Sequence, residues 1–256
     1  MSGAFFVPDG DGWVATTHTR GPWSRAHQHG GPPAALIAHV VEAAAPGLFV
    51  ARLTVDFLRP VPIDRLRVRL EPLRHGAKVQ RWIGLLLYAE TTVAHAVITL
   101  IRRQAVSMKP PADAPALPPP EASAPFQFPF FREADGYHTA METRLASGEF
   151  GSGRAAAWMR QRVPLVPDAA PSPLERVLIA ADSGSGVSAA IDHRRQTAVN
   201  ADLTVALSRP LEGEWVGLDS ISTYEPSGVG LADTRICDTR GTVGRVLQAL
   251  VLEERG

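Results

Sequence analysis

Apolar positions along the chain fall into two similar stretches, each consisting of one helix followed by four strands. Residues 34–41 are apolar at nearly every position, which is typical of a helix that is buried on all sides. A proline is tolerated in the first turn, so we predict this helix over residues 33–45. The runs that follow are rich in leucine and β-branched residues and are separated by turn residues, which favours strands. These strands are predicted at 51–59, 65–73, 79–89 and 92–102.

The helix of the second stretch is predicted from about Ser172 to Asp182. Ser172 is a suitable N-cap, and Glu175 follows it three positions later, which is the spacing of a capping box. Strands are predicted after this helix at 201–209, 214–223, 229–238 and 243–253, and before it at 137–147 and 154–163.

An internal repeat with a spacing of 150 residues relates the two stretches. The tripeptide Leu-Thr-Val at 53–55 returns at 203–205, and the pair Arg-Pro at 59–60 returns at 209–210. Several matches at one spacing indicate a duplicated domain. Further matches at this spacing are Thr92-Val93 with Thr242-Val243, Leu100 with Leu250, and Val79 with Val229.

A proline-rich segment separates the two copies. Residues 108–129 contain eight prolines, and proline lacks the backbone donor that helices and central strands need. We therefore predict an N-terminal domain over 1–105, an extended linker over 106–125 and a C-terminal domain over 126–256. Each domain is expected to be an α+β unit, in which one buried helix is wrapped by a long antiparallel sheet.

Composition and charge narrow the function. The chain has 26 basic and 26 acidic residues, which argues against a nucleic-acid partner. It has no apolar run long enough for a membrane helix and no secretory signal pattern at its start. The single cysteine, Cys237, fits a reducing compartment. We expect a cytoplasmic globular protein with no membrane or nucleic-acid partner, and self-association into a homo-oligomer stays open.

Six segments together resemble one enzyme family. HGGPPAALIAHVVEA, LTVDFLRP and LRHGAKVQRWIGLL from the first half, with AADSGSGV, LSRP and VLQALVL from the second, are similar to TesB-like acyl-CoA thioesterases (thioesterase II). The resemblance covers both halves and leaves out the proline-rich linker. It implies a double hotdog fold that hydrolyses acyl-CoA thioesters without a metal or prosthetic group. In that family an Asp, a Thr or Ser, and a Gln orient the attacking water, and these positions map onto Asp182, Asn200 and Gln248. Asn200 departs from the family hydroxyl, although a carboxamide also donates and accepts hydrogen bonds.

The same positions stand out without the family. Asp182 follows Leu178 by four residues on the apolar stripe of its helix, where a carboxylate is costly unless it is paired or catalytic. Burial is expected to raise the pKa of Asp182 and to suit it to act as a base. The alternative is a helix C-cap, because glycines follow it at once.

Gln248 is the only polar residue on its face of the last predicted strand. At the repeat spacing, Gln248 corresponds to Ile98, and Asn200 corresponds to Val50. This asymmetry predicts that the second half carries the polar site, while the first half retains apolar packing. The alternative for each amide is a structural bond to the backbone.

His29, Gly30 and Gly31 precede the first buried helix. Unpaired amides at a helix N-terminus attract negative charge, so this segment is expected to bind the thioester and to stabilise its oxyanion. An ordinary glycine turn is the alternative.

Other chemistries fit the sequence less well. His27 and His29 lack nearby acidic or cysteine residues, which argues against a metal site, and there is no Gly-x-Ser-x-Gly nucleophile motif. Cys237 lies in an apolar strand and is interpreted as a core residue. A hotdog hydratase is disfavoured because no histidine follows Asp182 before His193. A non-catalytic acyl-CoA-binding protein stays open because of the amide at Asn200.

Overall fold

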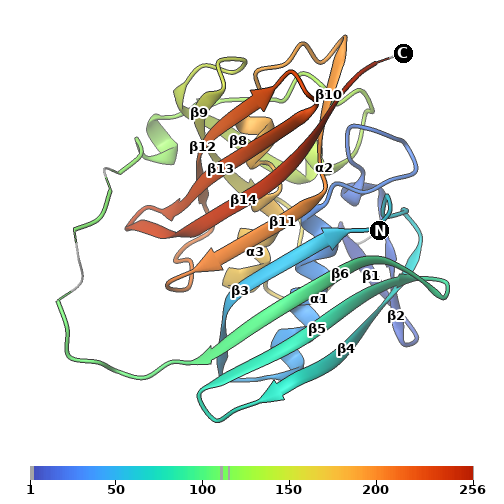
Figure 1. Cartoon of the computed structure of the whole chain (residues 1–256), viewed down its shortest axis with the longest axis vertical. Coiled ribbons are helices and arrows are strands. Elements are labelled where there is room, and N and C mark those ends of the chain that lie inside the picture. The colour runs from blue at the N-terminus through green and yellow to red at the C-terminus, as the bar shows by residue number, and fades with distance from the viewer. Residues whose placement is uncertain (1–2, 110–111, 115, 256) are drawn as a thin grey trace.

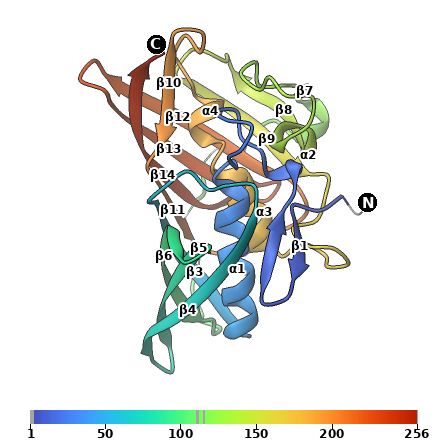
Figure 2. The ribbon, with the colours of Figure 1, turned by 90° about the vertical axis from the view of Figure 1, so that its right-hand side faces the viewer.

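A computed structural model describes residues 3–109, 112–114 and 116–255 of the chain. Within these residues, one continuous antiparallel sheet of 14 strands wraps around two central helices (Figures 1 and 2). Among the helices that the structure describes, none has both the length and the hydropathy that crossing a bilayer requires.

The N-terminal half contributes one long helix and four long strands, as the apolar pattern predicts. The helix is α1 (Gly31–Ala44), and the strands are β3 (Leu48–Phe57), β4 (Arg65–His75), β5 (Val79–Tyr88) and β6 (Thr91–Arg102). A short hairpin, β1 (Phe6–Asp9) and β2 (Gly12–Ala15), was not predicted and extends the sheet beyond β4. Its two strands have four residues each, too few to show a clear alternation of apolar and polar positions.

The C-terminal half repeats this plan with additional elements. Its helices are α3 (Pro173–Ala181) and the short α4 (Gly184–Val187). Its strands are β7 (Ala124–Pro125), β8 (Met141–Gly148), β9 (Arg154–Gln161), β10 (Gln196–Asn200), β11 (Asp202–Leu207), β12 (Val216–Glu225), β13 (Val229–Asp238) and β14 (Gly241–Glu254). The capping box is confirmed, since Ser172 Oγ accepts from the Glu175 amide at 3.1 Å and Glu175 Oε2 accepts from the Ser172 amide at 3.0 Å.

The strand predicted over 137–147 is wrong in its first turn. Residues Tyr137–Ala140 form a single helical turn, α2, before β8 begins. The Tyr137 amide donates to the carbonyl of Arg20 at 3.0 Å, and Thr139 Oγ1 accepts from the Gly136 amide at 3.1 Å. These local and long-range bonds satisfy the backbone in place of a strand partner.

The repeat spacing reappears at the centre of the sheet, where β3 and β11 pair and join the two halves. Thr54 lies opposite Thr204 in this pairing, and their Oγ1 atoms are 3.3 Å apart. Each threonine therefore faces its own counterpart in the repeat, as expected when two copies of one fold are related by an approximate twofold axis. The strands β5 and β13 also begin and end 150 positions apart.

The helices α1 and α3 pack side by side in opposite directions beneath the sheet. Gly31, at the start of α1, lies so close to α3 that a Cβ atom there would be 2.3 Å from the carbonyl oxygen of Ile179. Only glycine permits this approach. The start of α1 is therefore held against the end of α3, where Asp182 is located.

The segment between the halves is anchored on the C-terminal half. Trp158 Nε1 donates to the carbonyl of Pro118 at 2.7 Å, and Asp113 Oδ2 accepts from the Thr242 amide at 2.6 Å. Residues 110–111 and 115 of the predicted linker lie outside the described residues.

Candidate active site

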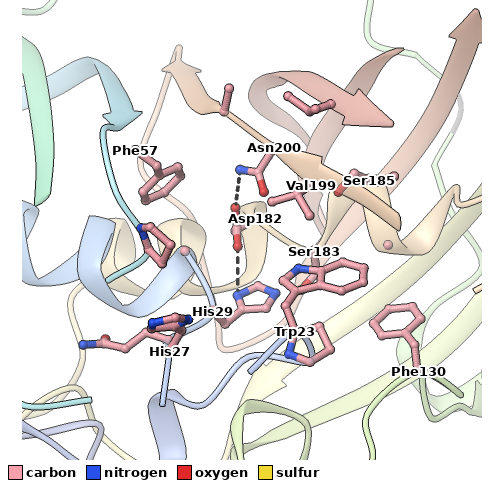
Figure 3. Close-up of a pocket in the computed structure, with 18 of the residues that line it drawn as sticks. Trp23, His27, His29, Phe57, Phe130, Asp182, Ser183, Ser185, Val199 and Asn200 are labelled. Atoms are coloured by element: carbon pink, nitrogen blue, oxygen red, sulfur yellow. Dashed lines mark hydrogen bonds and ion pairs between the residues drawn. The ribbon is translucent and has the colours of Figure 1, made fainter. Parts of the chain in front are cut away.

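A cavity of about 510 Å³ lies where loops of the N-terminal half meet the end of α3 (Figure 3). Its walls come from the loop before α1, the loop after β3, the α3–α4 region and β10. Most of the lining is apolar and aromatic; it includes Trp23, Phe57, Phe128, Phe130, Phe131 and Val199. Asp182, Asn200, His29 and Gly30 also line this cavity, so four of the six predicted site residues meet there.

Asp182 is the C-cap of α3, and its carboxylate points into the cavity. The side chain is nearly buried, with 6% of the residue exposed. Oδ2 is 3.0 Å from Nδ1 of His29, and Oδ1 accepts from Nδ2 of Asn200 at 2.9 Å (Figure 3). The Gly30 amide also donates to this carboxylate. Asp182 is thus both a helix cap and a member of the site.

The expected rise in the pKa of Asp182 is corrected by the structure. Burial does favour the neutral acid, but the charge and hydrogen bond of His29, with the bonds from Asn200 and Gly30, outweigh it. The pKa of Asp182 is therefore lowered, and the group is a carboxylate at neutral pH. The sequence argument considered only burial, because the donors come from segments distant in the chain.

Asn200 ends β10 and spends both of its amide hydrogens on the protein. Nδ2 donates to Asp182 Oδ1 and to the carbonyl of Asp202, each at 2.9 Å. These two bonds fix the rotamer and the orientation of the amide. The residue lines the cavity, and the amide oxygen accepts no hydrogen bond from any residue that the structure describes.

Gln248 lies behind Asp182 rather than on the cavity wall. It is fully buried on β14, and the predicted alternation of that strand is confirmed. Nε2 donates to the backbone carbonyl of Asp182 at 3.1 Å and lies 3.4 Å from its Oδ1, while Oε1 accepts from the Ser185 amide at 3.0 Å. Gln248 therefore holds the turn between α3 and α4.

The glycine segment before α1 supports Asp182 and is not oriented to receive a thioester carbonyl. The Gly30 amide donates to Asp182, and the Gly31 amide points to His29 Nδ1 at 3.4 Å. Pro32 and Pro33 add no donors to this turn. The expected oxyanion site at Gly30 and Gly31 is thus not supported by this arrangement. Gly31 is buried against Ile179 and does not line the cavity.

Tyr137 is a member of the site that the sequence did not reveal. Its ring stacks on His29 with centroids 3.7 Å apart and planes 4° apart. Its hydroxyl donates to the carbonyl of Ile179 at 2.8 Å and lies 2.9 Å from Ser183 Oγ. Burial and the nearby Asp182 charge raise the pKa of Tyr137, so it is a neutral phenol that orients the imidazole. No signal at position 137 alone indicates this contact.

The interpretation of Cys237 agrees with the structure. The thiol is buried on β13, and burial raises its pKa to about 11, which leaves it protonated at neutral pH. Among the described residues, no group of three or more His, Cys, Asp or Glu side chains is placed to hold a metal ion.

Comparison with known proteins places the chain in a family. The model of the acyl-CoA thioesterase N-terminal domain matches residues 19–101, and that of the acyl-CoA thioesterase C-terminal domain matches residues 111–252. The chain belongs to the acyl-CoA thioesterase family. The protein is thus an enzyme of thioester hydrolysis with acyl-CoA as its class of substrate. A search of the curated proteins found none that matches this thioesterase.

Solved structures share the fold of this thioesterase along nearly its whole length. A candidate thioesterase from Novosphingobium aromaticivorans DSM 12444 is 23% identical, with a TM-score of 0.80, over 97% of this chain and 98% of that chain. A hot dog fold protein of unknown function from Alicyclobacillus acidocaldarius is 17% identical, with a TM-score of 0.76, over 98% and 96%. Acyl-CoA thioesterase II TesB2 from Mycobacterium marinum is 16% identical, with a TM-score of 0.70, over 90% and 91%. The double hotdog fold is therefore confirmed.

Proposed function

We propose that this thioesterase hydrolyses acyl-CoA by a direct attack of water, which is held between Asp182 and Asn200. The observation that carries the proposal is the nearly buried Asp182 carboxylate, which faces an apolar cavity and is fixed by donors from both halves of the chain. No covalent nucleophile is needed, since water itself forms the bond to the thioester carbon.

The hydrogen bonds around Asp182 leave room for one water molecule. A carboxylate has about four accepting positions, and His29, Asn200 and Gly30 occupy three of them. The remaining position accepts one hydrogen of the water, and the free amide oxygen of Asn200 accepts the other. The lone pair of the water oxygen is then directed at the thioester carbon.

Proton transfer follows from this arrangement. As the water oxygen bonds to the carbonyl carbon, one water proton passes to Asp182, and collapse of the tetrahedral intermediate breaks the carbon–sulfur bond. The products are the free acid and the CoA thiol, which takes up the proton. His29 and Asn200 keep Asp182 in place during this step, and Gln248 positions it through its backbone carbonyl.

The test is release of CoA thiol from a panel of acyl-CoAs of short to long chain length. Asp182→Asn should lower kcat by about 100- to 10,000-fold, the usual contribution of a general base. Asp56→Asn removes an exposed carboxylate on β3 and serves as the matched control, which should keep full activity. If Asp182→Asn folds and retains activity, the water is held elsewhere.

The acyl-CoA-binding alternative has a separate outcome. If the unaltered protein binds acyl-CoAs but releases no thiol from any of them, the cavity is a binding site and the catalytic proposal is wrong.

A further inference from the structure

The aromatic end of the cavity contains a histidine that the hydrolysis step does not use. His193, in the loop between α4 and β10, lines the cavity together with Phe130 and Trp23. Its ring lies between Phe130, at a centroid distance of 4.7 Å, and Phe150, at 5.7 Å. Phe130 in turn stacks on Trp23 at 6.2 Å, and in Figure 3 Trp23 lies between Asp182 and Phe130. His193 is thus remote from the carboxylate.

Both ring nitrogens of His193 are buried, and neither forms a hydrogen bond with any described residue. A buried polar atom without a partner is costly, on the order of 1–3 kcal/mol, so such atoms need an explanation. Burial and the charge of Arg255 lower the pKa of His193, and the ring is therefore a neutral imidazole. It offers one N–H donor and one bare nitrogen acceptor.

We propose that this end of the cavity selects acyl-CoAs whose acyl chain carries a hydroxyl group at its distal end, and that His193 is the selecting residue. The inference rests on the proposed function, because it places the acyl chain in the same cavity. A plain alkyl chain would pack on the phenylalanine rings but leave both His193 nitrogens unpaired. A carboxylate would bury a charge among these rings. A hydroxyl group is neutral and can donate or accept, so it satisfies a nitrogen of His193 in either tautomer.

The experiment compares octanoyl-, dodecanoyl- and hexadecanoyl-CoA, each beside its ω-hydroxy counterpart, with the unaltered enzyme and with His193→Phe. The phenylalanine keeps the aromatic stack and removes the nitrogens. At the chain length that best fits the cavity, the unaltered enzyme should favour the hydroxylated substrate in kcat/KM. His193→Phe should shift this ratio by about tenfold toward the plain chain, the effect of one neutral hydrogen bond.

A second variant and a control make the result interpretable. His193→Leu should shift the ratio in the same direction if the phenylalanine variant does not fold. Phe130→Leu changes the neighbouring ring without touching the nitrogens, and should alter both substrates alike. An unchanged ratio in both His193 variants would overturn the proposal. A preference for ω-carboxyacyl-CoA would also overturn it and indicate recognition of charge.

Failure of hydrolysis is distinguished from failure of selection by binding. Calorimetry with non-hydrolysable thioether analogues of the plain and ω-hydroxy acyl-CoAs measures the same preference without turnover. Tighter binding of the hydroxylated analogue, lost in His193→Phe, would support the selecting role even in a protein that releases no thiol. Equal binding of both analogues would contradict it.

Discussion

Ser172 donates its hydroxyl to Glu42 Oε2 at 2.6 Å, where the end of α1 meets the start of α3. The opposite ends of the same two helices meet at Asp182. The approximate twofold axis of the repeat therefore relates the Glu42 cluster to the candidate active site. His39 lies 2.8 Å from Glu175 in this cluster, but the counterparts of Asn200 and Gln248 are Val50 and Ile98, both buried and apolar. The first half thus keeps charged groups at the helix ends without the amides that would complete a water site.

The Glu42 cluster predicts that the protein loses stability as the pH rises. The bond to Glu175 raises the pKa of His39 against the effect of burial, and burial together with the Glu175 charge raises the pKa of Glu42. Both groups hold their protons more tightly when folded, so their stabilising contribution is present at low pH. It is lost for each group as the pH rises through its folded pKa. Urea unfolding between about pH 5 and pH 8.5 should show this decline, beginning near the ordinary histidine pKa of about 6.5.

His39→Gln should remove the histidine part of that decline while a hydrogen bond to Glu175 is still possible. His75→Gln, on the exposed end of β4, controls for the loss of a histidine. A slope in His39→Gln equal to that of the unaltered protein would show that the cluster does not govern the pH dependence.

Asp182 makes the opposite prediction for activity. Because its pKa is lowered below the ordinary value of 3.8, the carboxylate stays ionised throughout mildly acidic conditions. The profile of kcat/KM against pH should therefore show no loss from protonation of Asp182 above pH 3.8. Profiles recorded for the unaltered enzyme and for His29→Gln check this. The glutamine removes the positive partner, so the acid limb should move upward in that variant. An acid limb that stays in place would separate His29 from the ionisation of Asp182.

The same lowered pKa also affects stability. Ionised Asp182 favours the folded state above the unfolded pKa, and this contribution is lost as the pH falls through the folded pKa. Asp182→Asn should therefore lower the Tm near neutral pH. An unchanged or higher Tm would mean that burial outweighs the bonds from His29, Asn200 and Gly30.

Most of the fold could be predicted from the sequence because its strands and helices carry strong local patterns. The strand at 229–238 agrees with β13 at both ends, and the Ser172–Glu175 capping box marks the start of α3. The repeat spacing even predicts which threonine faces which across the centre. Asp182 and Asn200 could be identified from the family resemblance and from polarity in apolar surroundings.

The rest of the site depends on contacts between segments that are distant in the chain. His29 bonds to Asp182 across the two halves, and Tyr137 stacks on His29 from a third segment. Neither contact leaves a periodic trace in the sequence. The direction of the Asp182 pKa could not be predicted for this reason, since burial and compensating donors act in opposite senses. His193 was seen only as an absence of histidine nearer to Asp182, because its phenylalanine neighbours lie in another loop.

Gly31→Ala tests whether close helix packing holds the site together. The added Cβ would lie 2.3 Å from the Ile179 carbonyl oxygen, so α1 must move away from α3. We expect a marked loss of Tm and a reduced kcat, because His29 and Gly30 precede Gly31 directly. Gly151→Ala is a useful comparison, since no atom lies within 4 Å of the added Cβ there. The left-handed φ of 93° at Gly151 should cost stability while kcat is unchanged. Equal kcat losses in the two variants would mean that the effect is not transmitted through the helix contact.

The last prediction compares Gln248 with its counterpart Ile98. Each is fully buried at the same place in its half, so their burial is matched and only their chemistry differs. Gln248→Met keeps the volume but removes the bonds to Asp182 and to the Ser185 amide. It should lower kcat strongly, with some loss of stability from the unpaired amide. Ile98→Ala should cost about 2–5 kcal/mol of stability, as a core truncation, and leave kcat near normal in the folded fraction.

Measuring kcat and urea unfolding for both variants separates the two roles. Asn200→Ala should resemble Gln248→Met in its kinetics, since it removes a donor to the same carboxylate. Val50→Ala should behave as a milder Ile98→Ala, because a smaller apolar side chain is lost. Equal kinetic losses at Gln248 and Ile98 would mean that both halves take part in the reaction. Normal kcat in both Gln248→Met and Asn200→Ala would show that Asp182 does not depend on these amides for its position.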